Sequence, residues 1–298
     1  MRVAITGSNG LIGRALIDSL TADGHEIVRI VRDSSQAGEQ DAVWDVKNRT
    51  IGADKLEGVD AVVHLAGEPI GDSRWSDRTK REIHHSRLYG TKLIAETLAG
   101  LQAPPKVFLS GSAVGFYGDR GSQVLTEDAD PGEGFLADVC RDWEAAAQPA
   151  VDAGIRTAWL RTGVTIAEGG PLIDKIELPF KLGVGGKVGG GRQYVPWIAL
   201  EDHLRAMRFL LESEVDGPVN LTAPEPVTNA ELTKALGKAL NRPTILPIPT
   251  FAVTLLYGEM GRVLATSSQR AVPQRLLDEG FEFTQTDLTE ALTVALND

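Results

Sequence analysis

Three glycines near the amino terminus have the spacing of a phosphate-binding turn. They lie in the stretch TGSNGLIG, residues 6–13, which follows a short apolar run and opens an apolar helical pattern. A glycine at position 7 permits a turn with positive φ, one at 10 lets a pyrophosphate approach the backbone, and one at 13 lets helix and strand pack closely. The free N–H groups at the helix start would then face the phosphates. The contacts predicted here are Gly7, Asn9, Gly10, Leu11, Ile12 and Gly13. A purely structural strand–helix turn is the alternative.

The end of the next predicted strand, residues 24–32, bears on which dinucleotide is bound. Arg32 lies about 20 residues beyond the turn, where an acidic residue would bind the ribose 2′-hydroxyl of NAD and an arginine would accommodate the 2′-phosphate of NADP. We therefore predict NADP. The neighbouring Asp33 keeps NAD open, and a surface arginine without a ligand is the structural alternative.

Two further strand ends carry small or hydroxyl-bearing residues. The apolar run 60–67 ends in Leu65, Ala66 and Gly67, and such a run is typical of a central parallel strand. The run 106–112 ends in SGS, residues 110–112, and leads to FYG, residues 116–118. Ser112 is a candidate for holding a substrate oxygen, and a simple turn residue is the alternative.

Composition limits the class of protein. The chain has 298 residues, a net charge of −11, 42% hydrophobic residues and a pI near 5.0. These values favour a globular protein without a nucleic-acid surface. The single cysteine, Cys140, excludes an internal disulfide and a cysteine metal cluster. No stretch approaches the ~18 apolar residues of a membrane span, and a strand begins within three residues of Met1. We expect no metal site, no membrane partner and a cytoplasmic location.

The glycine turn and the SGS strand together resemble the extended, sugar-nucleotide-epimerase-like branch of the short-chain dehydrogenase/reductase superfamily. The resemblance implies an α/β fold, a Rossmann-type doubly wound parallel sheet with a smaller, mostly helical C-terminal substrate domain. It implies that the backbone of residues 65–67 passes along the cofactor and that Ser112 binds a substrate oxygen. The cofactor-binding residues it further implies are Glu82, Arg87, Ser110, Gly111 and Arg161. Arg87 occupies an asparagine position of that branch and offers a fixed fork of donors; solvated helix charges are the alternative for Arg87 and Glu82.

The proton-transfer pair of that superfamily, Tyr-x-x-x-Lys, does not occur in this sequence. The four tyrosines, at 89, 117, 194 and 257, are followed four residues later by Leu93, Gly121, Ile198 and Gly261. The stretch FLADVCRDWE, residues 135–144, places Leu136 and Cys140 in the two positions. Leucine cannot exchange a proton, and a thiol is a weak donor. Tyr117, which follows Ser112 on the same strand exit, is the remaining candidate proton donor.

With this departure, the sequence resembles an atypical subgroup of the superfamily, the epimerase-family proteins similar to the human oxidoreductase of the 39U type. Bacterial members are labelled nucleoside-diphosphate-sugar epimerases or cell-division inhibitors. The resemblance covers the full length and includes HLAGEPI at 64–70, LRTG at 160–163 and PWI at 196–198. It implies an NADP-dependent oxidoreductase or epimerase-like enzyme acting on a nucleotide sugar or a carbonyl compound. The alternative is a degenerate NADP-binding sensor or scaffold protein linked to cell division.

We expect two interleaved parts. Residues 1–170, with a return segment near 196–222, form the NADP-binding domain, and residues 171–298 form the substrate-binding region. Helices are predicted at 76–98 with Ser76 as its cap, 135–148, 229–240 with Asn229 as its cap, 251–265, 268–279 and 286–296. By analogy with related folds, a homodimer would form through the helices at 76–98 and 135–148.

Overall fold

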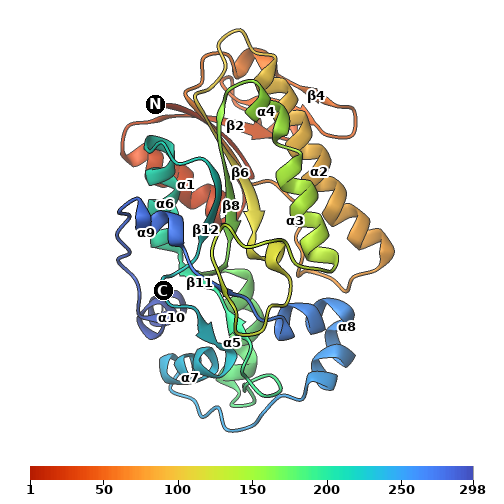
Figure 1. Ribbon diagram of the computed structural model, residues 1–298, viewed down its shortest axis with the longest axis vertical. Helices are drawn as coiled ribbons and strands as arrows, with labels where there is room; N and C mark the ends of the chain where they lie inside the picture. Colours follow the sequence, from red (N-terminus) through yellow and green to blue (C-terminus); the bar gives the residue numbers. More distant parts are fainter. Residues whose placement is uncertain (298) are drawn as a thin grey trace.

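The computed structural model describes residues 1–297 and contains an eight-stranded central sheet in the order β12-β8-β6-β5-β1-β2-β3-β4 (Figure 1). Every neighbouring pair is parallel except β3 and β4, which are antiparallel. The strands are β1 (Arg2–Thr6), β2 (Glu26–Val31), β3 (Ala42–Asp45), β4 (Thr50–Ile51), β5 (Ala61–His64), β6 (Val107–Ala113), β8 (Arg156–Thr162) and β12 (Gly217–Leu221). The predicted Rossmann-type α/β fold is confirmed.

The direction in which the chain adds strands to the sheet reverses between β1 and β5. The chain adds β1, β2 and β3 toward one edge of the sheet, and it then adds β5, β6, β8 and β12 toward the other edge. In doubly wound sheets, ligands bind outside the carboxyl ends of the strands at such a switch point. The glycine turn follows β1 directly and therefore lies at this switch point.

Helices cover both faces of the sheet (Figure 1). On one face α1 (Leu11–Ala22) and α6 (Leu200–Glu212) enclose an apolar core that includes Val3, Ile5 and Leu109. On the other face lie α2 (Asp77–Ala99), α3 (Phe135–Ala145) and α4 (Gln148–Asp152). Because strand side chains alternate between faces, Val62 and Phe108 pack on this second side. Ser76 caps α2 by accepting a hydrogen bond from the Thr79 N–H, as predicted.

A second core lies below the sheet in the view of Figure 1. It joins α5 (Pro171–Lys181), α7 (Asn229–Ala239) and α10 (Leu288–Asn297) with the short strands β9 (Val164–Ile166) and β11 (Trp197–Ala199). The cap of α7 differs from the prediction. Thr228, not Asn229, is the N-cap, and it forms a capping box with Glu231. The predicted domain boundaries remain predictions.

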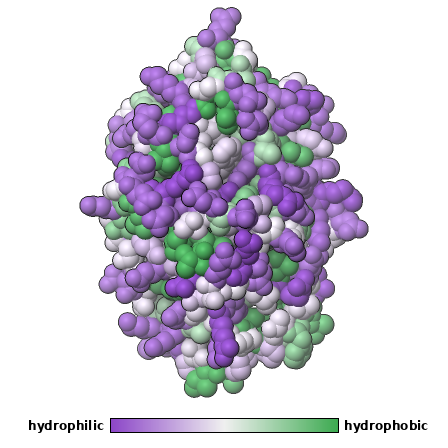
Figure 2. Space-filling view, in the orientation of Figure 1, coloured by the Kyte–Doolittle hydropathy of each residue, from purple (hydrophilic) through white to green (hydrophobic). Residues whose placement is uncertain are grey.

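The segment 250–279 is less regular than predicted. Helix α8 (Thr250–Thr266) kinks at Gly258, whose φ is +67°. The predicted helix 268–279 is wrong in its first half: β14 (Arg270–Ala271) pairs there with β7 (Val124–Leu125), and α9 (Gln274–Asp278) follows. Figure 2 shows apolar side chains at the lower end of the molecule. Exposed apolar residues near this part of the chain include Ile245, Phe251 and Leu255.

None of the helices within residues 1–297 combines the length and the apolar character needed to cross a membrane.

Candidate active site

The glycine turn has the geometry of a phosphate cradle. Gly7 has a φ of +70°, and a Cβ added there would lie 3.0 Å from the carbonyl carbon of Leu65. A Cβ added to Gly13 would lie 2.2 Å from the Gly7 carbonyl oxygen. The helix α1 begins after Gly10 without a side-chain cap and without an acidic residue in its first turn. The N–H groups of this first turn are thus directed at the switch point, where an anion would satisfy them.

A second loop lies against the glycine turn and is held by Thr6. The Thr6 Oγ1 atom accepts hydrogen bonds from the N–H groups of Leu65 (3.0 Å) and Ala66 (3.1 Å) and contacts His64 Nδ1 at 2.7 Å. Because the threonine hydroxyl accepts from both amides, it donates to His64. These bonds fix the loop after β5 close to the loop after β1.

The Arg87 side chain packs directly against this second loop. Its Nη1 atom donates to the carbonyl oxygens of Glu68 (2.8 Å) and Ile83 (3.1 Å), and its guanidinium lies 4.9 Å from the centre of the Trp143 ring. A Cβ added to Gly67 would lie 3.1 Å from Arg87 Cζ, so the glycine makes room for the arginine. Burial lowers the pKa of Arg87 from its usual value. The guanidinium group of Arg87 therefore lies at the switch point and is partly desolvated.

Glu82 does not share this environment. Its carboxylate is exposed and accepts a hydrogen bond from Arg78, one turn earlier, at 2.7 Å. The structure thus gives Glu82 an ordinary surface pair on α2, whereas it places Arg87 against the loop after β5.

In the loop after β2, Asp33 is hydrogen-bonded inside the protein, whereas Arg32 is exposed. Asp33 accepts hydrogen bonds from the N–H (2.9 Å) and the hydroxyl (2.7 Å) of Ser35, and these bonds lower the pKa of Asp33. Arg32 is exposed, and no ion pair involving it occurs in residues 1–297. The amide of Asn9 donates to Gln36 Oε1 at 3.2 Å and so connects this loop with the glycine turn.

A buried polar network occupies the carboxyl end of β6 and β8. The Ser112 hydroxyl donates to Glu144 Oε1 at 2.6 Å. Arg161 donates to both oxygens of the same carboxylate, at 2.8 and 2.9 Å. Arg161 also donates to the Tyr117 hydroxyl at 3.0 Å and to the Glu127 carbonyl at 3.0 Å.

This network bears on two sequence predictions. Arg161, whose donors are used by four bonds inside the protein, is only 3% exposed, which argues against a contact between its side chain and a cofactor. Tyr117 is fully buried, and its hydroxyl donates to Asn220 Oδ1 at 2.7 Å. Burial raises the pKa of Tyr117 to about 12. This environment argues against Tyr117 as the proton donor and gives it, like Arg161, a structural role.

The neighbouring glycine and cysteine have packing roles. A Cβ on Gly111 would lie 2.7 Å from the Trp143 ring, so glycine lets α3 approach β6. Cys140 is buried beside Gly115, and burial raises the pKa of its thiol to about 12. Ser110 is fully buried, and its hydroxyl has no hydrogen-bond partner in residues 1–297.

Sequence reasoning missed three residues of this region: Thr6, His64 and Glu144. Thr6 precedes the first glycine, His64 ends the buried strand, and Glu144 ends the WE step of α3. A polar residue at the end of an apolar strand run was the available signal for the first two. Glu144 gave no local signal because its partners are 17 and 32 residues away.

His64 makes stability depend on pH. Burial, with a smaller effect of Arg87, lowers the pKa of His64 to about 3 from an ordinary value of 6.5. Between these values the unfolded chain binds a proton that the folded chain excludes, so the free energy of unfolding falls as the pH drops below 6.5. The expected loss is about 1.4 kcal/mol per pH unit. Urea unfolding at pH 7 and pH 5 measures it.

The variant His64→Gln is expected to lose part of this pH dependence. The buried His203, whose pKa burial lowers to about 4, keeps its own part. His85→Gln, on the surface, serves as the control and should retain the full dependence. Equal dependence in the His64 and His85 variants would contradict the assignment.

Comparisons with known proteins agree with this geometry. Residues 3–222 match the model of the NAD dependent epimerase/dehydratase family, and residues 248–295 match a domain of unknown function. The chain is 41% identical over 294 residues to an epimerase family protein of Mycobacterium leprae, covering 98% of this chain and 95% of that one. A crystal structure of the human epimerase family protein SDR39U1 with NADPH is 32% identical, covers 100% of both chains and superposes with a TM-score of 0.90.

A more distant structure, MoeE5 in complex with UDP-glucose and NAD, has a TM-score of 0.79 at 21% identity, covers 100% of this chain and 98% of that one, and shows the fold alone. The fold and the switch-point geometry define an extended short-chain dehydrogenase/reductase. The chain belongs to the NAD dependent epimerase/dehydratase family and is similar to SDR39U1 over its whole length.

Proposed function

We propose that this protein is an NADP-dependent oxidoreductase or epimerase-like enzyme whose substrate is a nucleotide sugar or a carbonyl compound. The observation that carries the proposal is the glycine turn, where the uncapped start of α1 faces the loop 65–67 across the switch point. Bound NADPH would supply the hydride for reduction. The residues proposed to hold it are Gly7, Asn9, Gly10, Leu11, Ile12, Gly13, Arg32, Leu65, Ala66, Gly67 and Arg87.

The cofactor contacts that the resemblance implies at Glu82, Ser110 and Gly111 stay predictions. Ser112 remains the proposed substrate contact. Its proton is donated to Glu144, so its oxygen is left to accept a hydrogen bond from a substrate hydroxyl. The cytoplasmic location stays a prediction from the sequence.

The preference for NADP over NAD follows from the loop after β2. Asp33 is already bonded to Ser35, whereas Arg32 is exposed at the position where a 2′-phosphate would lie. The NADPH in the human SDR39U1 structure supports the same choice.

Calorimetric titration tests this choice. The wild-type protein is expected to bind NADPH more tightly than NADH, and Arg32→Ala should weaken NADPH binding by about 10- to 100-fold, the value of a charge-assisted hydrogen bond. NADH binding should not change. Arg49→Ala, an exposed arginine paired with Glu96, is the matched control. Equal affinities for both dinucleotides in the wild type would refute the NADP assignment.

The second candidate function is an NADP-binding sensor or scaffold protein without turnover, linked to cell division. The structural roles of Tyr117 and Arg161 favour it, because they remove the remaining candidate for proton transfer. NADPH consumption with a panel of carbonyl compounds and nucleotide sugars supports the enzyme, whereas binding without consumption supports the sensor.

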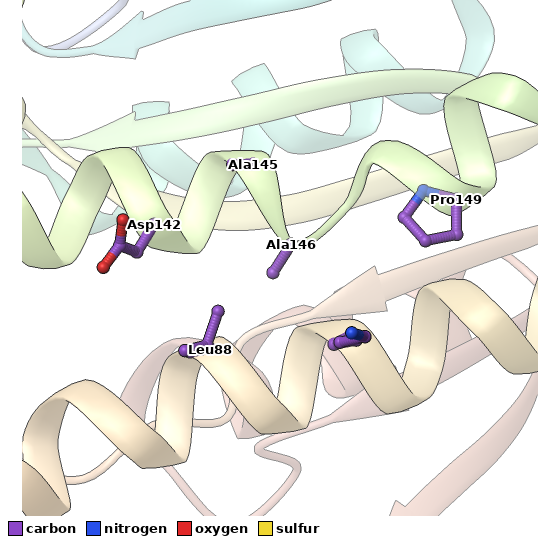
Figure 3. Close-up of a pocket in the computed structure, with 6 residues that line it drawn as sticks. Leu88, Asp142, Ala145, Ala146 and Pro149 are labelled. Atoms are coloured by element: carbon purple, nitrogen blue, oxygen red, sulfur yellow. The ribbon is translucent and has the colours of Figure 1, made fainter.

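We also propose a homodimer formed through α2, α3 and α4. A groove of about 270 Å³ lies between these helices and is lined by Leu88, Lys92, Asp142, Ala145, Ala146 and Pro149 (Figure 3). Tyr89, which follows Leu88 on α2, is 48% exposed. Light scattering should give the mass of a dimer, and Leu88→Asp should give that of a monomer; a monomeric wild type would exclude the dimer.

A further inference from the structure

The path of the proposed cofactor indicates where a substrate would be reduced. If the 2′-phosphate lies at Arg32 beyond β2 and the diphosphate at the turn after β1, the dinucleotide continues past the loop after β5 toward β6. Ser112 lies near the carboxyl end of β6, and the short helix η3 (Val114–Tyr117), which α3 contacts, follows the strand. A Cβ added to Gly115 in η3 would lie 3.4 Å from Leu136 Cβ. The reactive end of the cofactor would therefore lie near Leu136.

The surroundings of Leu136 are apolar. A cluster made by the loop after β5, α2, α3 and α8 buries Trp75, Ile83, Val139 and Met260. Four members of this cluster are only partly buried: Ile70, Phe135, Leu136 and Val263. The Trp75 and Phe135 rings are 5.0 Å apart. We call these four partly buried side chains the apolar wall. An apolar wall fits an uncharged, flat molecule better than a sugar with many hydroxyl groups.

The proton donors of this region are already occupied. The Ser112 proton goes to Glu144, and the Glu144 carboxylate is held by Arg161. Tyr117 and Cys140 are buried, and the pKa of each is raised to about 12. The ammonium group of Lys80, 5.3 Å from the centre of the Phe135 ring, is paired with Glu259 at 2.6 Å. Each of these groups is therefore either buried or already engaged by a partner inside the protein.

A simple ketone is a poor substrate for such a site, because hydride addition produces an alkoxide that needs a proton at once. A quinone avoids this requirement, because hydride addition gives an anion stabilised by delocalisation over the ring. We propose that the substrate is an apolar, uncharged quinone that lies against Leu136, Phe135 and Val263. The proposal rests on the proposed function and names its substrate class.

The reaction balances without an acid from the protein. The quinone would accept the hydride that NADPH supplies and become the hydroquinone monoanion, while NADPH becomes NADP⁺. Solvent water would then give the anion one proton, which completes the hydroquinone and leaves hydroxide. The role of the chain is to hold the flat ring against the apolar wall and to exclude charged competitors.

Duroquinone is a suitable probe because its methyl groups block addition of thiols. We expect the wild-type protein to consume NADPH with duroquinone and not with cyclohexanone or UDP-glucose, relative to protein-free mixtures. In the presence of NADP⁺, duroquinone should bind and quench tryptophan fluorescence, which gives a reading independent of turnover.

Charged substitutions in the wall test the location. Leu136→Asp and Val263→Asp should each weaken duroquinone binding by about tenfold or more, because the ring would have to strip water from a carboxylate. NADPH affinity should remain unchanged in Val263→Asp, whose side chain lies on α8 outside the residues proposed to hold the cofactor, and circular dichroism verifies that both variants are folded. Val294→Asp, on the exposed face of α10, is the matched control.

Three results would overturn the proposal: no duroquinone binding by a wild type that binds NADPH, binding of UDP-glucose in its place, or unchanged duroquinone affinity in both wall variants. The first of these leaves the NADP assignment intact. Failure of the wild type to bind NADPH would instead refute the proposed function.

Discussion

Replacing Glu144 by alanine is expected to lower the free energy of unfolding by about 3–5 kcal/mol, the cost of leaving a buried charge without its partner. The carboxylate accepts hydrogen bonds from Ser112 and, through both oxygens, from Arg161, whose side chain is only 4% exposed. Its removal leaves the Arg161 guanidinium unpaired among Phe116, Tyr117 and the core. Urea denaturation followed by circular dichroism measures the change.

Two variants separate this effect from a general loss of a glutamate. Glu96→Ala removes an exposed partner of Arg49 and should change stability by about 0.5 kcal/mol or less. The double variant Glu144→Leu with Arg161→Met removes both charges and should recover part of the lost stability. If Glu144→Ala behaved like Glu96→Ala, the buried network would not have the role described.

Replacing Gly13 by valine is expected to abolish most dinucleotide binding, with an affinity loss of about 100-fold or more, or about 3 kcal/mol. A Cβ at this position would lie 2.2 Å from the Gly7 carbonyl oxygen, so either the turn or the start of α1 must move. Either movement redirects the N–H groups proposed to hold the diphosphate. Calorimetric titration with NADPH measures the loss, after circular dichroism has verified the fold.

Gly100→Ala is the control for adding a side chain. A Cβ at position 100 would lie 3.5 Å from its nearest neighbours, an ordinary contact, and the residue has a φ of −93°. Its NADPH affinity should match that of the wild type. Full NADPH affinity in a folded Gly13→Val protein would contradict the proposed position of the diphosphate.

The sheet and its order of elements could be predicted because they depend on local patterns. The apolar runs at 60–67 and 106–112 are long enough to mark central strands, and the glycine turn fixes the link between the first strand and helix. The cap at Ser76 was equally visible in the sequence. At 228–229 two residues compete for the cap, and Thr228 forms it because Glu231 completes the capping box.

Side-chain direction at the carboxyl ends could not be predicted in the same way. The order of Ser112 and Tyr117 along the chain placed both near a substrate, but η3 turns Tyr117 into the core, where Asn220 lies 103 residues further along the chain. The partner of Arg161 was hidden for the same reason. Positions on strands follow from periodicity, whereas partners from distant segments depend on packing.

The C-terminal part shows the same limit. The predicted helix at 251–265 exists, but it kinks at Gly258, and Arg74 binds the turn before the kink by donating to the carbonyl oxygen of Leu256 at 2.8 and 3.1 Å and also to that of Leu255. No pattern near residue 258 reveals an arginine in the loop after β5. These hydrogen bonds connect Arg74 with α8, and Val263 on α8 belongs to the same apolar cluster as Leu136.

A crystal structure of this protein with NADPH tests the central claim most directly. Electron density for the diphosphate is predicted against the N–H groups at the start of α1, with the 2′-phosphate within hydrogen-bond distance of Arg32. Density for the dinucleotide elsewhere on the molecule, or a 2′-phosphate directed away from Arg32, would contradict the account.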